Sequence, residues 1–157
     1  MAILLTDVDI ARLLTEPKTL AADYQSRLQP RSKAGHKERD LDIVGQSGSE
    51  FQIIVRQSSF NPLDFSVILA YSLPRSGVLF RLRRYNGRSH QHTNQIEEIT
   101  FYDFHIHTAT ERYQDAGYAE EHFAEVTDRY VDLNGAIRCL IDDCTFELPP
   151  GTQGSFL

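Results

Sequence analysis

The chain has 157 residues and a formal net charge of −6 with histidine neutral; 41% of its residues are hydrophobic and 24% are charged. These values are ordinary for one soluble globular domain, and they exclude a general nucleic-acid coat protein, which needs concentrated Lys and Arg. We find no apolar run long enough to cross a bilayer and no signal peptide, so we expect a cytoplasmic protein without a membrane partner.

Two helices are predicted near the N-terminus. Thr6 and Asp9 are typical of a capping box, and they open a short helix with an apolar stripe. Pro17 suits the first turn of a second helix, which we expect to run to about Leu28. The polar segment 29–37 predicts a loop.

The middle of the chain predicts β structure, because apolar and polar residues alternate there. The strands are expected over residues 40–44, 51–56, 65–71, 78–85 and 101–107. Their connections are too short for crossover helices, so we expect the sheet to be antiparallel.

The C-terminal part predicts two more helices, over residues 119–130 and 136–141, followed by a flexible tail over 149–157. The two cysteines, Cys139 and Cys144, are interpreted as reduced packing residues. The predicted fold is a single α+β domain over residues 1–148: a four- to five-stranded antiparallel sheet with N- and C-terminal helices packed on one face.

The most informative feature is a cluster of histidines. Four of the six histidines lie within residues 90–107, as His90, His92, His105 and His107. Neutral imidazole suits proton transfer or metal ligation near neutral pH. Residues 75–88 contain five arginines and no acid, which indicates a local basic surface on an acidic protein.

Strand alternation predicts which side chains share a face. It puts Arg81, Arg83 and Tyr85 on the face opposite the helices, together with His105 and His107. His90 and His92 follow Asn86-Gly87, a strong hairpin signal. A tight turn there, or a one-residue bulge at Gly87, would bring both histidines to the arginine face; an unbulged continuous strand would separate them.

This assembly suggests RNA cleavage without a metal or another cofactor. One histidine would take the proton of a 2′-hydroxyl, while a second would protonate the leaving oxygen; His90, His92, His105 and His107 are the candidates. Arg81, Arg83 and Arg84 would stabilise charge on the phosphate, and Tyr85 and Tyr113 would position it or stack on a base. The substrate that we expect is single-stranded RNA.

Two alternatives remain open. The pattern His-x-His on a strand also occurs in zinc and iron sites, so His90, His92, His105 and His107 are candidate metal ligands. The polar face is also what any half-buried sheet needs, in which case the protein is a non-catalytic interaction protein. His36 and His122 are interpreted as solvated surface residues.

Several short motifs resemble an uncharacterised family of bacterial, archaeal and phage proteins. They are residues 84–90 (Arg-Tyr-Asn-Gly-Arg-Ser-His), Asn94, residues 105–107 (His-Ile-His) and residues 111–113 (Glu-Arg-Tyr). More remotely, the same order resembles TumE-like toxins of bacterial toxin–antitoxin systems. That resemblance implies a small toxin-like RNase whose protein partner is an antitoxin.

Overall fold

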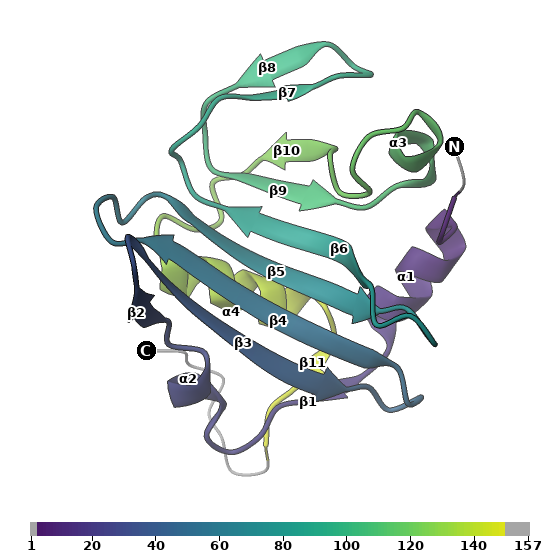
Figure 1. The fold of residues 1–157 in the computed structure, drawn as a ribbon, viewed down its shortest axis with the longest axis vertical. Helices are drawn as coiled ribbons and strands as arrows, with labels where there is room; N and C mark the ends of the chain where they lie inside the picture. The colour runs from purple at the N-terminus through teal and green to yellow at the C-terminus, as the bar shows by residue number, and fades with distance from the viewer. Residues whose placement is uncertain (1–2, 150–157) are drawn as a thin grey trace.

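The computed structural model describes residues 3–149 and contains a large antiparallel sheet (Figure 1). Seven strands form it in the spatial order β10-β9-β6-β5-β4-β3-β2, and each neighbouring pair is antiparallel. The α+β class is confirmed, but the sheet is larger than predicted. Its strands are β2 (Arg31–Lys33), β3 (His36–Val44), β4 (Glu50–Ser58), β5 (Phe65–Ser72), β6 (Leu79–Asn86), β9 (His105–Thr108) and β10 (Ala124–Val126).

Helix α4 (Leu133–Asp143) packs against β5 and β6, and we call the face that it covers the inner face. Helix α1 (Asp7–Thr15) contributes to the same core and begins at the predicted capping box of Thr6 and Asp9. The two other helices, α2 (Tyr24–Arg27) and α3 (Glu111–Asp115), are short. The prediction that N- and C-terminal helices pack on one face of the sheet is therefore confirmed only in part. The core includes Leu13, Leu14, Ile53, Val55, Val67, Leu69, Phe80, Leu82, Ile137 and Leu140.

The predicted helix over residues 17–28 is confirmed only for the four residues of α2, and its first part is wrong. Residues 18–19 form β1 (Lys18–Thr19), which pairs in parallel with β11 (Phe146–Glu147). The buried Lys18 ammonium binds carbonyl oxygens at the ends of α1 and α4, where backbone acceptors lack helical partners. These hydrogen bonds hold the backbone at Lys18 extended, although the apolar residues that follow are spaced as in a helix. The four acceptors are the carbonyl oxygens of Leu13, Leu14, Glu16 and Cys144.

The predicted helix over residues 119–130 is also wrong, because this segment adds strand β10 to the free side of β9. Pairing with β9 gives hydrogen-bond partners to backbone groups that would be unpaired at an uncovered sheet edge. This stabilisation outweighs the helical preference of the segment. The predicted loop over 29–37 likewise forms β2 and the start of β3. The fourth predicted helix, over residues 136–141, is confirmed as part of α4, which Asp132 caps.

The predicted strands over 51–56, 65–71 and 78–85 are confirmed as β4, β5 and β6. The one predicted over 101–107 is divided: β8 (Ile99–Phe101) pairs with β7 (His92–Asn94) in a separate hairpin, and β9 joins the large sheet. Figure 1 shows this hairpin beyond β9 and β10, at the top of the view.

Cys139 and Cys144 are buried free thiols, as predicted. Among residues 3–149, no helix is long and apolar enough to span a membrane. The tail predicted over 149–157 lies outside the described residues except for Pro149.

Candidate active site

A bulge in β6 decides which arginines face the histidines. Leu69 of β5 pairs with Arg83, whereas the next residue, Ala70, pairs with Arg81. Leu82 therefore lies opposite no residue of its own, and this extra residue shifts the alternation of side chains along the rest of the strand.

Beyond the bulge, Arg83 and Tyr85 belong to the inner face. The Tyr85 hydroxyl is buried and donates to Asp143 Oδ2 of α4 at 2.7 Å, and Arg83 Nη1 lies 3.7 Å from the same carboxylate oxygen. The expectation that Arg83 and Tyr85 share a face with Arg81 and the histidines is therefore wrong. Arg84 points to the opposite side, which we call the outer face, and it lines a pocket there.

Three of the four clustered histidines lie in mutual contact. The ring of His92 is 5.5 Å from that of His105 and 4.8 Å from that of His107, between centroids. The rings of His105 and His107 are 4.9 Å apart. The predicted convergence of the two histidine pairs is confirmed for these three rings.

The route by which they converge differs from both predicted routes. β6 pairs with β5 and β9 instead of with residues 90–92, and the chain leaves the sheet at Gly87. A Cβ atom on Gly87 would lie 1.9 Å from the carbonyl oxygen of Leu63. Glycine is needed here because the two backbone segments pass so close to each other. The hairpin of β7 and β8 then carries His92 back to β9.

His90 joins the three other histidines at a pocket of about 290 Å³ on the outer face. We call it the histidine pocket. It is polar and partly open, and its walls come from β5, β6, β9 and the segment between β6 and β7. Its lining includes Asp64, Ser66, Arg84, Asn86, Ser89, His90, His92, His105 and His107.

Backbone carbonyl groups fix the protons of two imidazole rings. Nδ1 of His105 lies 2.7 Å from the carbonyl oxygen of Asp103, and Nδ1 of His107 lies 2.8 Å from that of Glu121. A carbonyl oxygen can only accept, so each Nδ1 carries the proton and each Nε2 has a lone pair that can accept a hydrogen bond. The Asn86 amide nitrogen lies 3.4 and 3.5 Å from these two Nε2 atoms.

Burial keeps these imidazoles neutral. Desolvation lowers the pKa of His92 and of His105, and it lowers the pKa of His107 to about 3. The neighbouring histidines act in the same direction on all three, because a second positive charge in the cluster is unfavourable. At neutral pH the rings can therefore accept a proton or a hydrogen bond.

Arg84 brings a positive charge to the pocket. Its Nη2 donates to Glu121 Oε2 at 2.7 Å, which anchors one side of the guanidinium. Two buried polar atoms of pocket residues, Arg84 Nε and Asn86 Oδ1, have no hydrogen-bond partner among the described residues. Such atoms are rare in folded proteins and are often explained by a ligand or by water.

A chain of hydrogen bonds orients His90. Ser89 Oγ donates to Asp64 Oδ1 at 3.1 Å, and it lies 2.9 Å from Nδ1 of His90. The hydroxyl has one proton, so when it donates to Asp64 it must accept from Nδ1–H of His90. Nε2 of His90 is then the atom that is free to exchange protons.

The sequence is similar to a known family over most of its length. One model, described as a family of unknown function (DUF6978), matches residues 5–145. The chain belongs to this family. It matches none of the curated proteins and none of the solved structures with which it was compared.

Family membership agrees with the expected likeness to an uncharacterised family, whereas the likeness to TumE-like toxins stays a prediction. Within the matched region, the short motifs from which we expected a family surround the histidine pocket. Asn86, His90, His105 and His107 line it. Asn94 supports it, because its side chain bonds both backbone groups of Ala124 and accepts from His92 Nε2.

Tyr113 and Arg81 lie outside the pocket lining. Tyr113 is buried, and its hydroxyl donates to Glu97 Oε1. Arg81 forms ion pairs with Glu120 and Glu121. Neither residue is placed to act as the direct phosphate or base ligand that the sequence predicted.

Sequence reasoning missed His122, which it took for a solvated surface residue. The His122 ring lies 5.0 Å from that of His92 and stacks on Tyr113 at 5.3 Å. Its Nε2 donates to the carbonyl oxygen of Thr93. Glu121 and Asp64 were missed as well, because each comes from a segment distant from the histidine cluster in the sequence.

A metal site would need several ligands that point to one position. Within residues 3–149, no group of three or more His, Cys, Asp or Glu side chains is arranged to hold a metal ion. His105 and His107 present two Nε2 lone pairs to the same amide group. His92 uses its own Nε2 to donate to Asn94, so the three rings do not present equivalent ligand atoms.

Proposed function

We propose that this protein is a ribonuclease that cleaves single-stranded RNA by metal-independent acid–base catalysis in the histidine pocket. One observation carries the proposal. Two imidazoles with protons fixed on Nδ1 line one pocket beside the guanidinium of Arg84, and their Nε2 atoms, which contact the Asn86 amide, carry lone pairs that can accept a proton.

His105 is the proposed general base. Its Nε2 takes the proton from a ribose 2′-hydroxyl, and the 2′-oxygen attacks the adjacent phosphorus atom. The hydrogen bond from Nδ1 to the Asp103 carbonyl stabilises the imidazolium that forms. This is the role that a hydrogen-bonded partner has for a catalytic histidine.

His90 is the proposed general acid. It gives its Nε2 proton to the 5′-oxygen as the bond between phosphorus and that oxygen breaks. The products are a 2′,3′-cyclic phosphate and a 5′-hydroxyl, and proton exchange with water restores both histidines. The hydrogen bonds that link Asp64, Ser89 and His90 orient the ring and leave its Nε2 to face the leaving oxygen.

Arg84 is the proposed ligand of the phosphate in the transition state. Glu121 holds the guanidinium on one side, and Nε is the unpartnered donor on the other. A charged donor that is already oriented lowers the free energy of the developing negative charge. His107 and Asn86 are positioning residues, because their mutual contact orients the wall beside His105.

The pocket suits an unpaired strand. Its volume of about 290 Å³ is at the small end of ligand pockets and accommodates part of one nucleotide. In a duplex the bases are stacked, and sequence-specific RNA recognition therefore uses single-stranded segments whose bases can be splayed apart.

The test is cleavage of a fluorescent single-stranded RNA in EDTA, with product ends identified by mass spectrometry. We expect His105→Gln and His90→Ala to lower kcat by about 100-fold or more. Absence of cleavage in EDTA by the wild-type protein, or full activity in His105→Gln, would refute the mechanism. A 2′-deoxy substrate should not be cut.

Two neighbouring arginines provide a matched control. Arg84→Lys keeps the charge but loses the guanidinium fork, so we expect kcat to fall about tenfold or more. Arg83→Lys, on the inner face, should leave kcat unchanged. Equal effects of the two substitutions would contradict the assignment of Arg84.

The resemblance to TumE-like toxins supports a finer proposal: a cytoplasmic toxin that a protein antitoxin inhibits. Induced expression in bacteria should then arrest growth, and His105→Gln should relieve the arrest at equal protein levels. Growth arrest that persists in this variant would show that toxicity does not depend on RNA cleavage, and it would contradict this finer proposal.

A further inference from the structure

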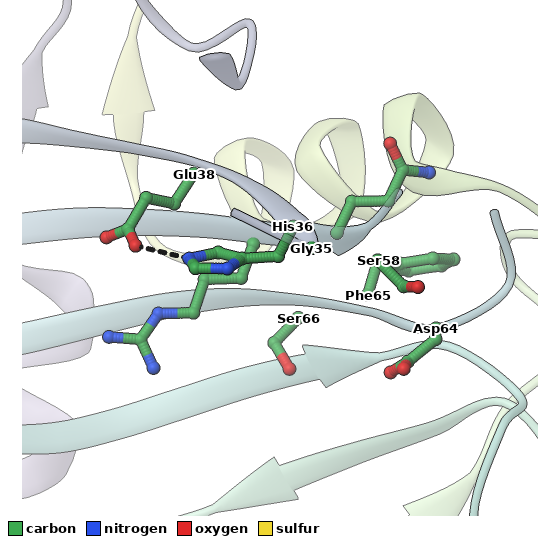
Figure 2. A pocket seen from close by; sticks show the side chains of 9 residues that line it. Gly35, His36, Glu38, Ser58, Asp64, Phe65 and Ser66 are labelled. Atoms are coloured by element: carbon green, nitrogen blue, oxygen red, sulfur yellow. Dashed lines mark hydrogen bonds and ion pairs between the residues drawn. The ribbon is translucent and has the colours of Figure 1, made fainter. Parts of the chain in front are cut away.

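A second cavity lies on the outer face, beside the histidine pocket. Its volume is about 590 Å³, and β3, β4, β5 and the adjoining turns form it. We call it the Arg56 cavity. Figure 2 shows His36 and Glu38 of β3, Ser58 of β4, Ser66 of β5 and Asp64 of the turn before β5 around it.

The two cavities are adjacent, because both are lined by Asp64, Phe65 and Ser66. A cross-strand row of paired residues runs from one cavity to the other. Arg56 pairs with Ser66, Ser66 with Asn86, and Asn86 with His105. Neighbouring strands lie about 4.8 Å apart, so Arg56 is about 14 Å along the sheet from the proposed general base.

The charged groups of the Arg56 cavity are complementary to the edge of a nucleobase. Among residues 3–149, no hydrogen bond or ion pair engages the exposed Arg56 guanidinium. Glu38, its cross-strand neighbour, is held through Oε1 by His36 Nε2 at 2.8 Å. This contact leaves Glu38 Oε2 available to accept hydrogen bonds.

An exposed aromatic ring stands beside the cavity. Phe60 is 85% exposed, yet its ring would lie 3.9 Å from a Cβ placed on Gly35, which lines the cavity. The turn that presents the ring is fixed, because Ser58 Oγ accepts from the backbone N–H groups of Phe60 and Asn61. Exposed aromatic rings beside polar grooves are the usual stacking platforms for unpaired bases.

We propose that the Arg56 cavity binds a nucleobase that flanks the scissile phosphate, and that it prefers guanine. This proposal rests on the proposed function and names the substrate feature that the site reads. Guanine offers O6 and N7 as acceptors for Arg56, and N–H donors at N1 and N2 for Glu38. Adenine presents an amino donor where the guanidinium needs an acceptor.

The test measures binding separately from cleavage. The probes are fluorescein-labelled 2′-fluoro oligouridylates, which lack the nucleophilic hydroxyl, with one guanine or one adenine at each position in turn. Fluorescence anisotropy should give a Kd about tenfold lower for guanine than for adenine at one position. Equal Kd values for all probes would overturn the proposal.

Three variants assign the effect to residues. Arg56→Gln should abolish the difference between guanine and adenine probes. Phe60→Ala should raise the Kd of both probes about tenfold and keep the difference, because stacking is largely independent of the base. Arg75→Gln, an exposed arginine in the turn between β5 and β6, should change neither quantity. A preference that survives Arg56→Gln would overturn the assignment.

The outcomes distinguish this proposal from the proposed function. Guanine-dependent binding that requires Arg56, without cleavage of the matching RNA, retains the base subsite and refutes the ribonuclease. Cleavage without base preference, unchanged in Arg56→Gln and Phe60→Ala, retains the ribonuclease and refutes the subsite. Circular dichroism spectra of the variants should match that of the wild-type protein.

Discussion

Acidification should destabilise this protein through His107, a ring that is folded into the pocket in its neutral form. Burial lowers the pKa of His107 from an ordinary 6.5 to about 3. Between these two pH values the unfolded chain binds a proton that the folded chain does not bind. The free energy of unfolding therefore falls as the pH falls below 6.5, and it is fully retained above that pH.

The magnitude follows from the same two pKa values. At pH 4.5, two pH units below the ordinary value and above the lowered one, the loss is about 3 kcal/mol from His107 alone. The lowered pKa values of His92 and His105 act in the same direction. His107→Gln keeps an N–H for the carbonyl oxygen of Glu121 but cannot take up a proton.

The assay is urea denaturation of both proteins at pH 7.0 and pH 4.5. The wild-type protein should lose about 3 kcal/mol more than His107→Gln between the two pH values. Tyr102→Phe, which removes only an exposed hydroxyl that donates to Ser89, should behave as the wild type. Equal losses in the wild-type protein and His107→Gln would refute the claim that His107 is buried as a neutral ring.

Three further predictions concern the framework around the site. Gly87→Ala should lower the free energy of unfolding by about 3 kcal/mol, measured by urea denaturation, because its Cβ would collide with the carbonyl oxygen of Leu63. Lys18→Met should cost at least about 3 kcal/mol in the same assay, because buried carbonyl groups lose their donor, whereas the exposed Lys33→Met should cost less than about 0.5 kcal/mol. Cys144 should react with a thiol reagent only on unfolding, since burial raises its pKa to about 11; rapid labelling of the native protein at pH 8 would contradict its position.

The elements that sequence reasoning predicted well carry their own local signals. Helix α1 begins at a capping box, and α4 has helical apolar spacing after the Asp132 cap. Strands β4, β5 and β6 are rich in apolar residues that lie buried, and α4 packs against β5 and β6. In these elements the local preference of the residues and their tertiary environment favour the same secondary structure.

The elements that it missed depend on partners far away in the sequence. β1 exists because it pairs with β11, more than 120 residues later, and β10 exists because β9 offers it an edge. Lys18 reads as a surface residue, yet it is fully buried because the ends of two helices supply its acceptors. No local periodicity contains that information.

The composition of the sequence located the histidine cluster that lines the pocket, but it did not predict which arginine lies beside it. The density of histidines at residues 90–107 identified the pocket, since imidazole is uncommon and acts in groups. The bulge opposite Leu69 and Ala70 then exchanged the faces of the arginines, so that Arg84 lines the pocket and Arg83 does not. A shift of one residue moves every later side chain in a strand to the other face, and it leaves no local mark in the sequence.

Burial distinguishes the histidine pocket from an ordinary solvent-facing polar sheet face. Solvent-facing histidines would keep their ordinary pKa values, whereas here burial lowers the pKa of three neighbouring rings. A structural core at this position would gain stability from apolar side chains, which carry no donors or acceptors to satisfy. Instead Arg84 Nε and Asn86 Oδ1 stay unpaired beside two oriented Nε2 atoms. A bound anion with hydroxyl groups, such as the ribose phosphate backbone, would satisfy these donors and acceptors.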